Sequence, residues 1–274
     1  MEQQAGSIVL ARRELVLVAA LLVLAARIVP REDAFLVAGI LPVVVLLAGI
    51  GVLGRDEAGR RPIEALLIPA VLTGGAAAAV HLVPAGLGLV PAIGAFALLL
   101  DRVVALETRL VGQQTGASEG DRSRILVGAV VTAFIAFTGI ATLVPGGLAE
   151  PGGAQAAGSL ALSEGWLLVL AIDDALIALL LGYRVASFRY GTARDAGRSA
   201  LTYAIVVAVA AGAVRAIDVP RLVGPAVLTL VFYLWDALHG TAPARRRDPR
   251  FLWETNLLAA LALVVVAWNL RLRN

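Results

Sequence analysis

The chain of 274 residues contains no cysteine and no lysine, so all 23 of its basic residues are arginines. Without cysteine there is no thiolate nucleophile, iron–sulfur cluster or disulfide. Without lysine there is no Schiff base for retinal or pyridoxal chemistry, and no phosphate-loop lysine. The sequence gives no sign of any other cofactor, and we expect none.

Charged residues are also scarce, at 16% of the chain against roughly 25% in soluble domains. Hydrophobic residues make up 59%, and the mean hydropathy is +0.87. A soluble core of this length could not bury so much apolar surface, so we predict an all-α, polytopic transmembrane bundle forming a single domain over 1–274. The net charge of +3 is spread between apolar runs, which argues against a nucleic-acid partner.

Apolar runs bounded by charge, proline or glycine predict nine membrane spans, each close to the ~20 residues that cross a bilayer. Their limits are 10–29, 34–54, 62–83, 87–106, 124–144, 164–183, 199–217, 222–239 and 251–270. Several are short or rich in glycine, so eight spans is the fallback. The first run follows two arginines as a signal peptide does, but we interpret it as a membrane helix.

The arginines predict the orientation, because cytoplasmic loops carry the excess of positive charge. With the N-terminus inside, 17 of the 23 arginines fall on the cytoplasmic side. The external ones are Arg27, Arg31, Arg215, Arg221, Arg271 and Arg273. We therefore predict a multi-pass protein of the inner (plasma) membrane, with a cytoplasmic N-terminus and an external C-terminus. Its partners would be lipids, with a small solute or ion, an oligomer or a partner subunit as further candidates.

Two longer connections are predicted, a flexible cytoplasmic loop over 107–123 and a glycine-rich external loop over 145–163. Four spans end outside in a Val-Pro pair that stops the helix. These pairs are Val29-Pro30, Val83-Pro84, Val144-Pro145 and Val219-Pro220. One interpretation is a duplicated helical hairpin, and the other is that membrane ends need such turns in any case.

The strongest functional signal is Asp173-Asp174, which lies near the middle of the sixth span. An ionisable group at that depth costs roughly 2.5–3.5 kcal/mol on insertion scales. We see no arginine or histidine at the same depth, so we predict a proton- or cation-binding site. The alternative is a neutral acid that hydrogen-bonds between helices.

Polar and helix-breaking residues in nearby spans are expected to support this site. Thr73, Thr132 and Thr138 are candidate neighbours of the two acids. Pro69 with Gly74-Gly75, and Pro91 with Gly94, are expected to interrupt their helices and let backbone groups line a cavity.

A second group of polar residues shares the depth of the cytoplasmic face, where it could form a vestibule. Its members are Glu64, Asp101, Arg184, Asp236, His239 and Glu254. The alternative is that these charges lie at the interface and pair with their neighbours. Asp101 and Asp236 lie near helix C-termini, where an acid opposes the helix dipole, so each needs an arginine partner. Arg215 and Asp218 are interpreted as an ordinary interfacial pair.

The two histidines exclude one class of site. His81 and His239 are predicted at opposite ends of their spans, so they cannot share a haem or a metal, and we predict no metal site. The chain also carries no signature motif of intramembrane prenyltransferases, CDP-alcohol phosphotransferases or rhomboid proteases.

Three functional hypotheses remain open. The leading one is a small-solute or ion transporter that uses Asp173 and Asp174. The second is a membrane enzyme acting on a lipid or phosphate-bearing headgroup through the cytoplasmic acids and arginines. The third is an accessory or assembly subunit without chemistry. A transporter is favoured over an enzyme because no compact catalytic motif is present.

Overall fold

In the computed structural model the described residues are 2–50, 63–84, 86–111, 118–144, 164–216 and 222–240, with 249, 252–253, 256–258 and 260 of the C-terminal segment. The elements over these ranges are all helical. They are α1 (Glu2–Ala26), α2 (Arg31–Gly49), the 3-10 turn η1 (Ile63–Leu66), α3 (Leu67–Ala79), the 3-10 turn η2 (Val80–Leu82), α4 (Leu89–Leu110), α5 (Glu119–Leu143), α6 (Glu164–Ser187), α7 (Ala193–Ala216) and α8 (Val223–Gly240).

These helices coincide with eight of the nine predicted spans, and the ninth falls almost entirely outside the described residues. Among the described residues, six helices are long and apolar enough to cross a membrane, which is consistent with a multi-pass membrane protein. The cytoplasmic loop predicted over 107–123 is wrong at both ends, because α4 continues to Leu110 and α5 begins at Glu119. The external loop over 145–163 lies outside the described residues.

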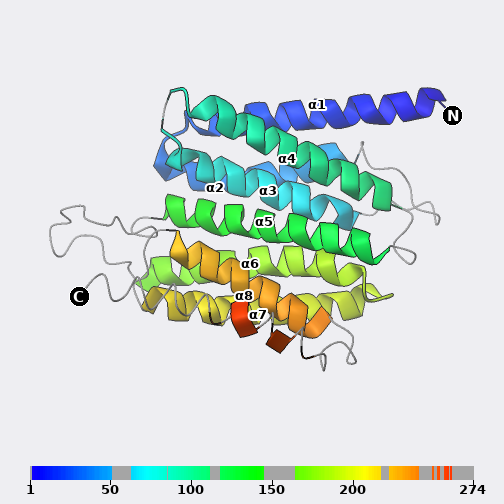
Figure 1. The fold of residues 1–274 in the computed structure, drawn as a ribbon. Coiled ribbons are helices and arrows are strands. Elements are labelled where there is room, and N and C mark those ends of the chain that lie inside the picture. Colours follow the sequence, from blue (N-terminus) through cyan, green and yellow to red (C-terminus); the bar gives the residue numbers. More distant parts are fainter. Residues whose placement is uncertain are drawn as a thin grey trace.

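The helices run side by side along one common direction, in a row that starts with α1 and α4 and ends with α7 and α8 (Figure 1). α3 is the central member and packs against α1, α2, α4, α5 and α6. Its residues from Ile68 to Ala78 are all buried. α6 continues the row from α5 and packs most closely on α7. The helix that carries the two aspartates is thus inside the row.

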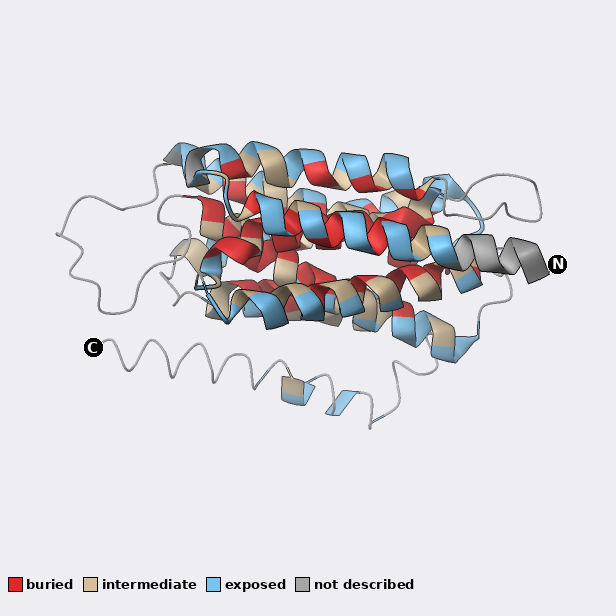
Figure 2. Cartoon of the chain, turned by 90° about the horizontal axis from the view of Figure 1, so that it is seen from above, coloured by how far each residue is buried: buried red, intermediate tan, exposed pale blue. Residues whose placement is uncertain are grey.

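The outward faces of the helices are apolar, whereas their inward faces are buried (Figure 2). Large hydrophobic side chains such as Leu36, Leu98 and Val209 are about two-thirds exposed in the isolated chain, at 65%, 67% and 69%. Soluble monomers rarely expose apolar surface on this scale. A lipid environment accounts for it, because hydrocarbon needs no polar partners on the outer face.

Small residues bring α3 and α5 into backbone contact. A Cβ atom added at Gly139 would lie 2.3 Å from the backbone oxygen of Gly75, and one added at Gly75 would lie 2.6 Å from the Cα of Ala136. Such close approach is how membrane helices gain packing energy when the surrounding lipid is as apolar as leucine. The expectation that Pro69 and Gly74-Gly75 interrupt this helix is wrong, because α3 is continuous from Leu67 to Ala79.

The same holds for α4, which runs without a break through Pro91 and Gly94. Pro91 lies in the first turn, where the missing N–H has no helical acceptor to lose. Prolines do end helices where the sequence predicted: Val83 and Val144 are extended residues with ψ of 124° and 128° that follow η2 and α5. The ring of a following proline excludes the helical conformation from the residue before it.

Candidate functional site

Asp173 and Asp174 lie in the first half of α6, between the end that begins at Glu164 and the centre of the helix. Asp174 is fully buried, with 0% of its surface exposed, whereas Asp173 is half-buried. Arg215 of α7 donates a hydrogen bond to Asp174 Oδ2 and forms an ion pair with it. The prediction that no arginine reaches these acids is therefore wrong.

The directions of the side chains explain how Arg215 reaches so far inward from the last turn of α7. In a helix each Cα–Cβ bond tilts toward the N-terminus. α6 and α7 are consecutive antiparallel helices joined by a short turn, so Arg215 points into the bundle while Asp174 points toward the end from which Arg215 comes. The interfacial pair proposed for Arg215 is thus replaced by a deeper one, and its suggested partner, residue 218, lies outside the described residues.

Three buried atoms of this cluster have no hydrogen-bond partner in the described part of the chain: Asp173 Oδ2, Asp174 Oδ1 and Arg215 Nη1. Arg215 supplies one positive charge to two carboxyl groups. With both acids ionised, the cluster carries one net negative charge. Because Arg215 is bound to Asp174, that charge resides on Asp173.

The predicted threonine neighbours do not hydrogen-bond to the aspartates. Thr73 donates to the backbone oxygen of Pro69 in its own helix, at 2.8 Å. The hydroxyls of Thr132 and Thr138 are buried and have no partner among the described residues. Asp174 is therefore paired with Arg215 rather than with these hydroxyls, and Asp173 is paired with neither.

Asp173 lines a cavity of about 300 Å³, which we call the α2–α6 groove. α2 and α6 form its sides, and α3 and α5 form its floor. Gly39 and Pro42 of α2, Gly74 and Gly75 of α3 and Asp173 of α6 are among its lining residues. A second cavity of about 220 Å³ lies among α1, α3, α4 and α5 and has a wholly apolar lining. Of these two cavities, only the groove contains a charged side chain.

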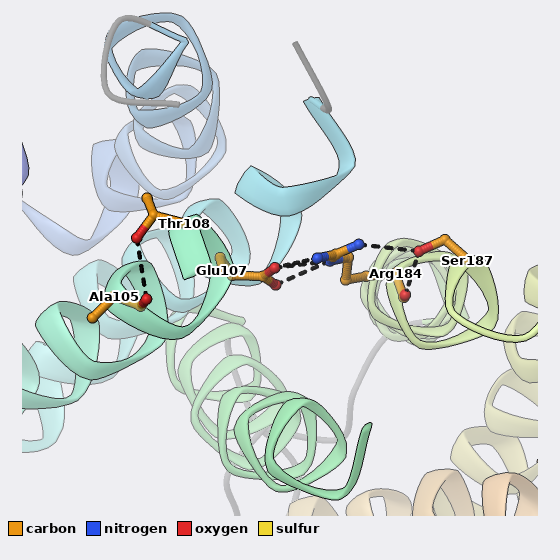
Figure 3. Close-up of polar contacts among 5 residues, drawn as sticks. All are labelled: Ala105, Glu107, Thr108, Arg184 and Ser187. Atoms are coloured by element: carbon orange, nitrogen blue, oxygen red, sulfur yellow. Dashed lines mark hydrogen bonds and ion pairs between the residues drawn. The ribbon is translucent and has the colours of Figure 1, made fainter. Parts of the chain in front are cut away.

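Three of the six residues predicted to form a cytoplasmic vestibule, Asp101, Arg184 and Asp236, belong to separate ion pairs. Arg184 of α6 donates to both carboxylate oxygens of Glu107 on α4, through Nε at 3.0 and 3.1 Å and also through Nη2 (Figure 3). Its Nη1 donates to Ser187 at 3.1 Å, and the guanidinium lies 4.2 Å from the ring centroid of Phe188. Both partners are only 1% exposed, so Arg184 is an interhelical clamp.

Glu107 is not among the site residues predicted from the sequence, because it was assigned to the loop over 107–123. Arg184 could have revealed it, since a cation buried at a helix end requires an anion nearby. Glu64 lies in η1, the turn that precedes α3. Its negative charge repels the carboxylate of Glu107.

The arginine partners expected for Asp101 and Asp236 are confirmed. Arg12 Nε lies 3.0 Å from Asp101 Oδ1, although its N–H does not point at the carboxylate. Asp236 Oδ1 accepts from Arg189 Nη2 and from the hydroxyl of Tyr203, both at 2.5 Å. Burial alone would lower the pKa of Arg189, but Asp236 and Tyr203 outweigh it and leave that pKa raised.

Neither histidine joins these groups into one site. His239 stacks on Trp235 at 3.7 Å between ring centroids, at the end of α8, and His81 is buried in η2 at the opposite end of the bundle. Glu254 lies outside the described residues. Within the residues that the structure describes, no three acidic or histidine side chains come together as a metal site would require. Asp101, Arg184 and Asp236 thus belong to three interhelical contacts, on α1–α4, on α4–α6 and between the α6–α7 turn and α7–α8.

Comparison with known proteins gives no further guide: no family model matches the chain, and no curated protein or solved structure matches it significantly.

Proposed function

We propose that the chain is a membrane transporter for a small solute or ion, in which Asp173 binds the transported cation or a coupling proton. Asp174 and Arg215 form the fixed charge pair beside it. We also propose the orientation that the arginines predict, with a cytoplasmic N-terminus and an external C-terminus in the inner membrane.

One observation supports this function above the others. A carboxylate oxygen that is buried in the bundle, has no partner in the described part of the chain and lines a cavity must be neutralised by a proton or a cation. A carboxylate that is paired with a fixed arginine, as Asp174 is, has no counter-ion to exchange. A carboxyl group that can exchange its counter-ion can couple binding to movement across the membrane.

The enzyme hypothesis has less support, because the acids and arginines that it needs are bound to one another. Asp101 and Asp236 pair with Arg12 and Arg189, and neither acid lines the two cavities described above. The accessory hypothesis predicts a solid interior without a charged cavity, whereas the α2–α6 groove contains Asp173.

The test is charge displacement in liposomes that contain the purified full-length chain, adsorbed on a solid-supported electrode. Steps in external pH and in a panel of small cations, neutral solutes and anions would be applied. We expect a transient current on a pH step or with a cationic solute. The current should be abolished in Asp173→Asn and retained in Asp195→Asn, which removes an exposed acid from the start of α7.

Either of two results would refute transport through this site. One is the absence of a current in the wild-type protein under every condition. The other is a current in Asp173→Asn equal to that of the wild type.

A further inference from the structure

The rim of the α2–α6 groove lies on the outer apolar face of the bundle. Val43 of α2 and Leu176 of α6 line the groove and are still 52% and 49% exposed. Gly75 and Ala136, on its floor, are buried. In the described part of the chain the groove therefore opens sideways between α2 and α6, at the depth where hydrocarbon surrounds the helices.

The residues that line the groove determine which class of ligand it can bind. Its side chains include one carboxylate, that of Asp173, and no N–H or O–H donor. Pro42 cannot donate to the backbone oxygen of Ala38 four residues earlier, and both residues line the groove. The polar groups that the lining offers are thus acceptors, which suit a cation and oppose an anion.

A metal ion does not fit this lining. Sodium, calcium and magnesium ions need several oxygen ligands to replace their hydration shells, and the groove offers only one carboxylate and the backbone oxygen of Ala38 among apolar walls. An organic ammonium is different, because its charge lies within an apolar body and loses less on leaving water. Its apolar part gains from the walls while its charge is paired with Asp173.

We infer that the α2–α6 groove binds an organic ammonium ion with an apolar body, which enters from the lipid between α2 and α6 and pairs with Asp173. This inference builds on the proposed function, since it names the class of substrate. The volume of about 300 Å³ is at the lower end of the range for small-molecule sites, so a single-ring amine fits better than a long-chain lipid.

The test is equilibrium binding of benzyltrimethylammonium to the purified full-length chain in nanodiscs. Its control ligand is neopentylbenzene, which has the same shape with carbon in place of the charged nitrogen. We expect the cation to bind more tightly than the neutral compound. Asp173→Asn should weaken the binding of the cation by about tenfold or more, and bring it close to that of the neutral compound.

Two leucine variants test the location of the site. A Cβ added at Gly39, which lines the groove, or at Gly212 of α7 would meet nothing within 4 Å, so the two positions have the same open space for the start of a side chain. Gly39→Leu should fill the groove and abolish the binding of both ligands. Gly212→Leu, the matched control, should leave binding unchanged.

The inference is overturned if the cation and its neutral analogue bind equally, or if Gly39→Leu has no effect. Its failure is distinguishable from failure of the proposed function. A current that depends on Asp173 and is driven by protons, without any binding of benzyltrimethylammonium, leaves transport standing and removes the ammonium. Binding that depends on Asp173 without any current keeps the ammonium site and removes transport.

Discussion

The buried pair of Glu107 and Arg184 gives the sharpest stability prediction. Replacing one partner leaves the other charge buried, because both side chains are 1% exposed and Arg184 directs three contacts at the carboxylate. Breaking such a pair costs ~3–5 kcal/mol, whereas a single interhelical hydrogen bond in a membrane protein averages ~0.6 kcal/mol. This pair lies near the end of the bundle, where water can partly solvate the charge that is left. We therefore expect a cost at the lower end of the ~3–5 kcal/mol range.

Glu107→Gln should therefore destabilise the protein by about 3 kcal/mol, which corresponds to a fall in melting temperature of roughly 6–12 °C for a domain of this size. Arg184→Gln should cost less, because an unpaired carboxylate can take up a proton whereas a guanidinium cannot lose one. The measurement is the thermal unfolding midpoint of the purified protein in detergent.

Two controls complete this experiment. Arg198→Gln removes an arginine that is 67% exposed and lies 3.9 Å from Asp195, so it should change stability by less than about 0.5 kcal/mol. The double replacement of Glu107 and Arg184 by methionine should recover most of the loss, since two apolar side chains leave no charge unpaired. A fall of only 1–2 °C in Glu107→Gln, equal to about one ordinary hydrogen bond, would refute the clamp.

Three further predictions concern the remaining contacts and the orientation. Tyr203→Phe removes the hydroxyl that donates to a carboxylate on α8, and should cost about 1.5–3 kcal/mol in the same thermal assay; no change would contradict that bond. Gly139→Ala should destabilise the protein because its Cβ would meet backbone at 2.3 Å, whereas Gly212→Ala has open space and should not. Because the chain lacks cysteine, Leu87→Cys and Gly191→Cys introduce single labels for a membrane-impermeant maleimide. In cells Leu87→Cys should react and Gly191→Cys should not; the reverse pattern would invert the topology.

Over the described residues, the sequence predicted where the helices lie, and the reason is the bilayer. A span must be apolar over its full length, so its limits are visible as charges and prolines, as at Val83 and Val144. The ends of a helix are harder to predict from the sequence where a charged residue near the end is buried. α4 continues past Glu107 because Arg184 satisfies that carboxylate, and the partner lies 77 positions away in the chain.

Asp173 and Asp174 were singled out from the sequence, but the arginine that pairs with Asp174 was not. The depth of Asp174 in the membrane was predicted from its position along the span. The depth of Arg215 was predicted in the same way, from the position of its Cα. An arginine side chain is long enough to place its guanidinium far from its Cα, so backbone depth understates where the charge lies. Likewise Gly74 and Gly75 were predicted to break their helix. In the structure they let α3 approach α2 and α5 closely, and they line the floor of the groove.

The consequence of the Asp174–Arg215 pair is that a proton and an organic cation would compete for one carboxyl group. If Arg215 were absent, the two neighbouring carboxylates would repel each other without any cation between them. With Arg215 bound to Asp174, Asp173 alone remains to exchange its counter-ion. Under the proposed function, binding of an ammonium at Asp173 excludes its protonation, so uptake of the cation releases a proton. This mutual exclusion is the minimal requirement for exchanging a proton for an organic cation. Asp173, as a single carboxylate in an apolar groove, meets that requirement.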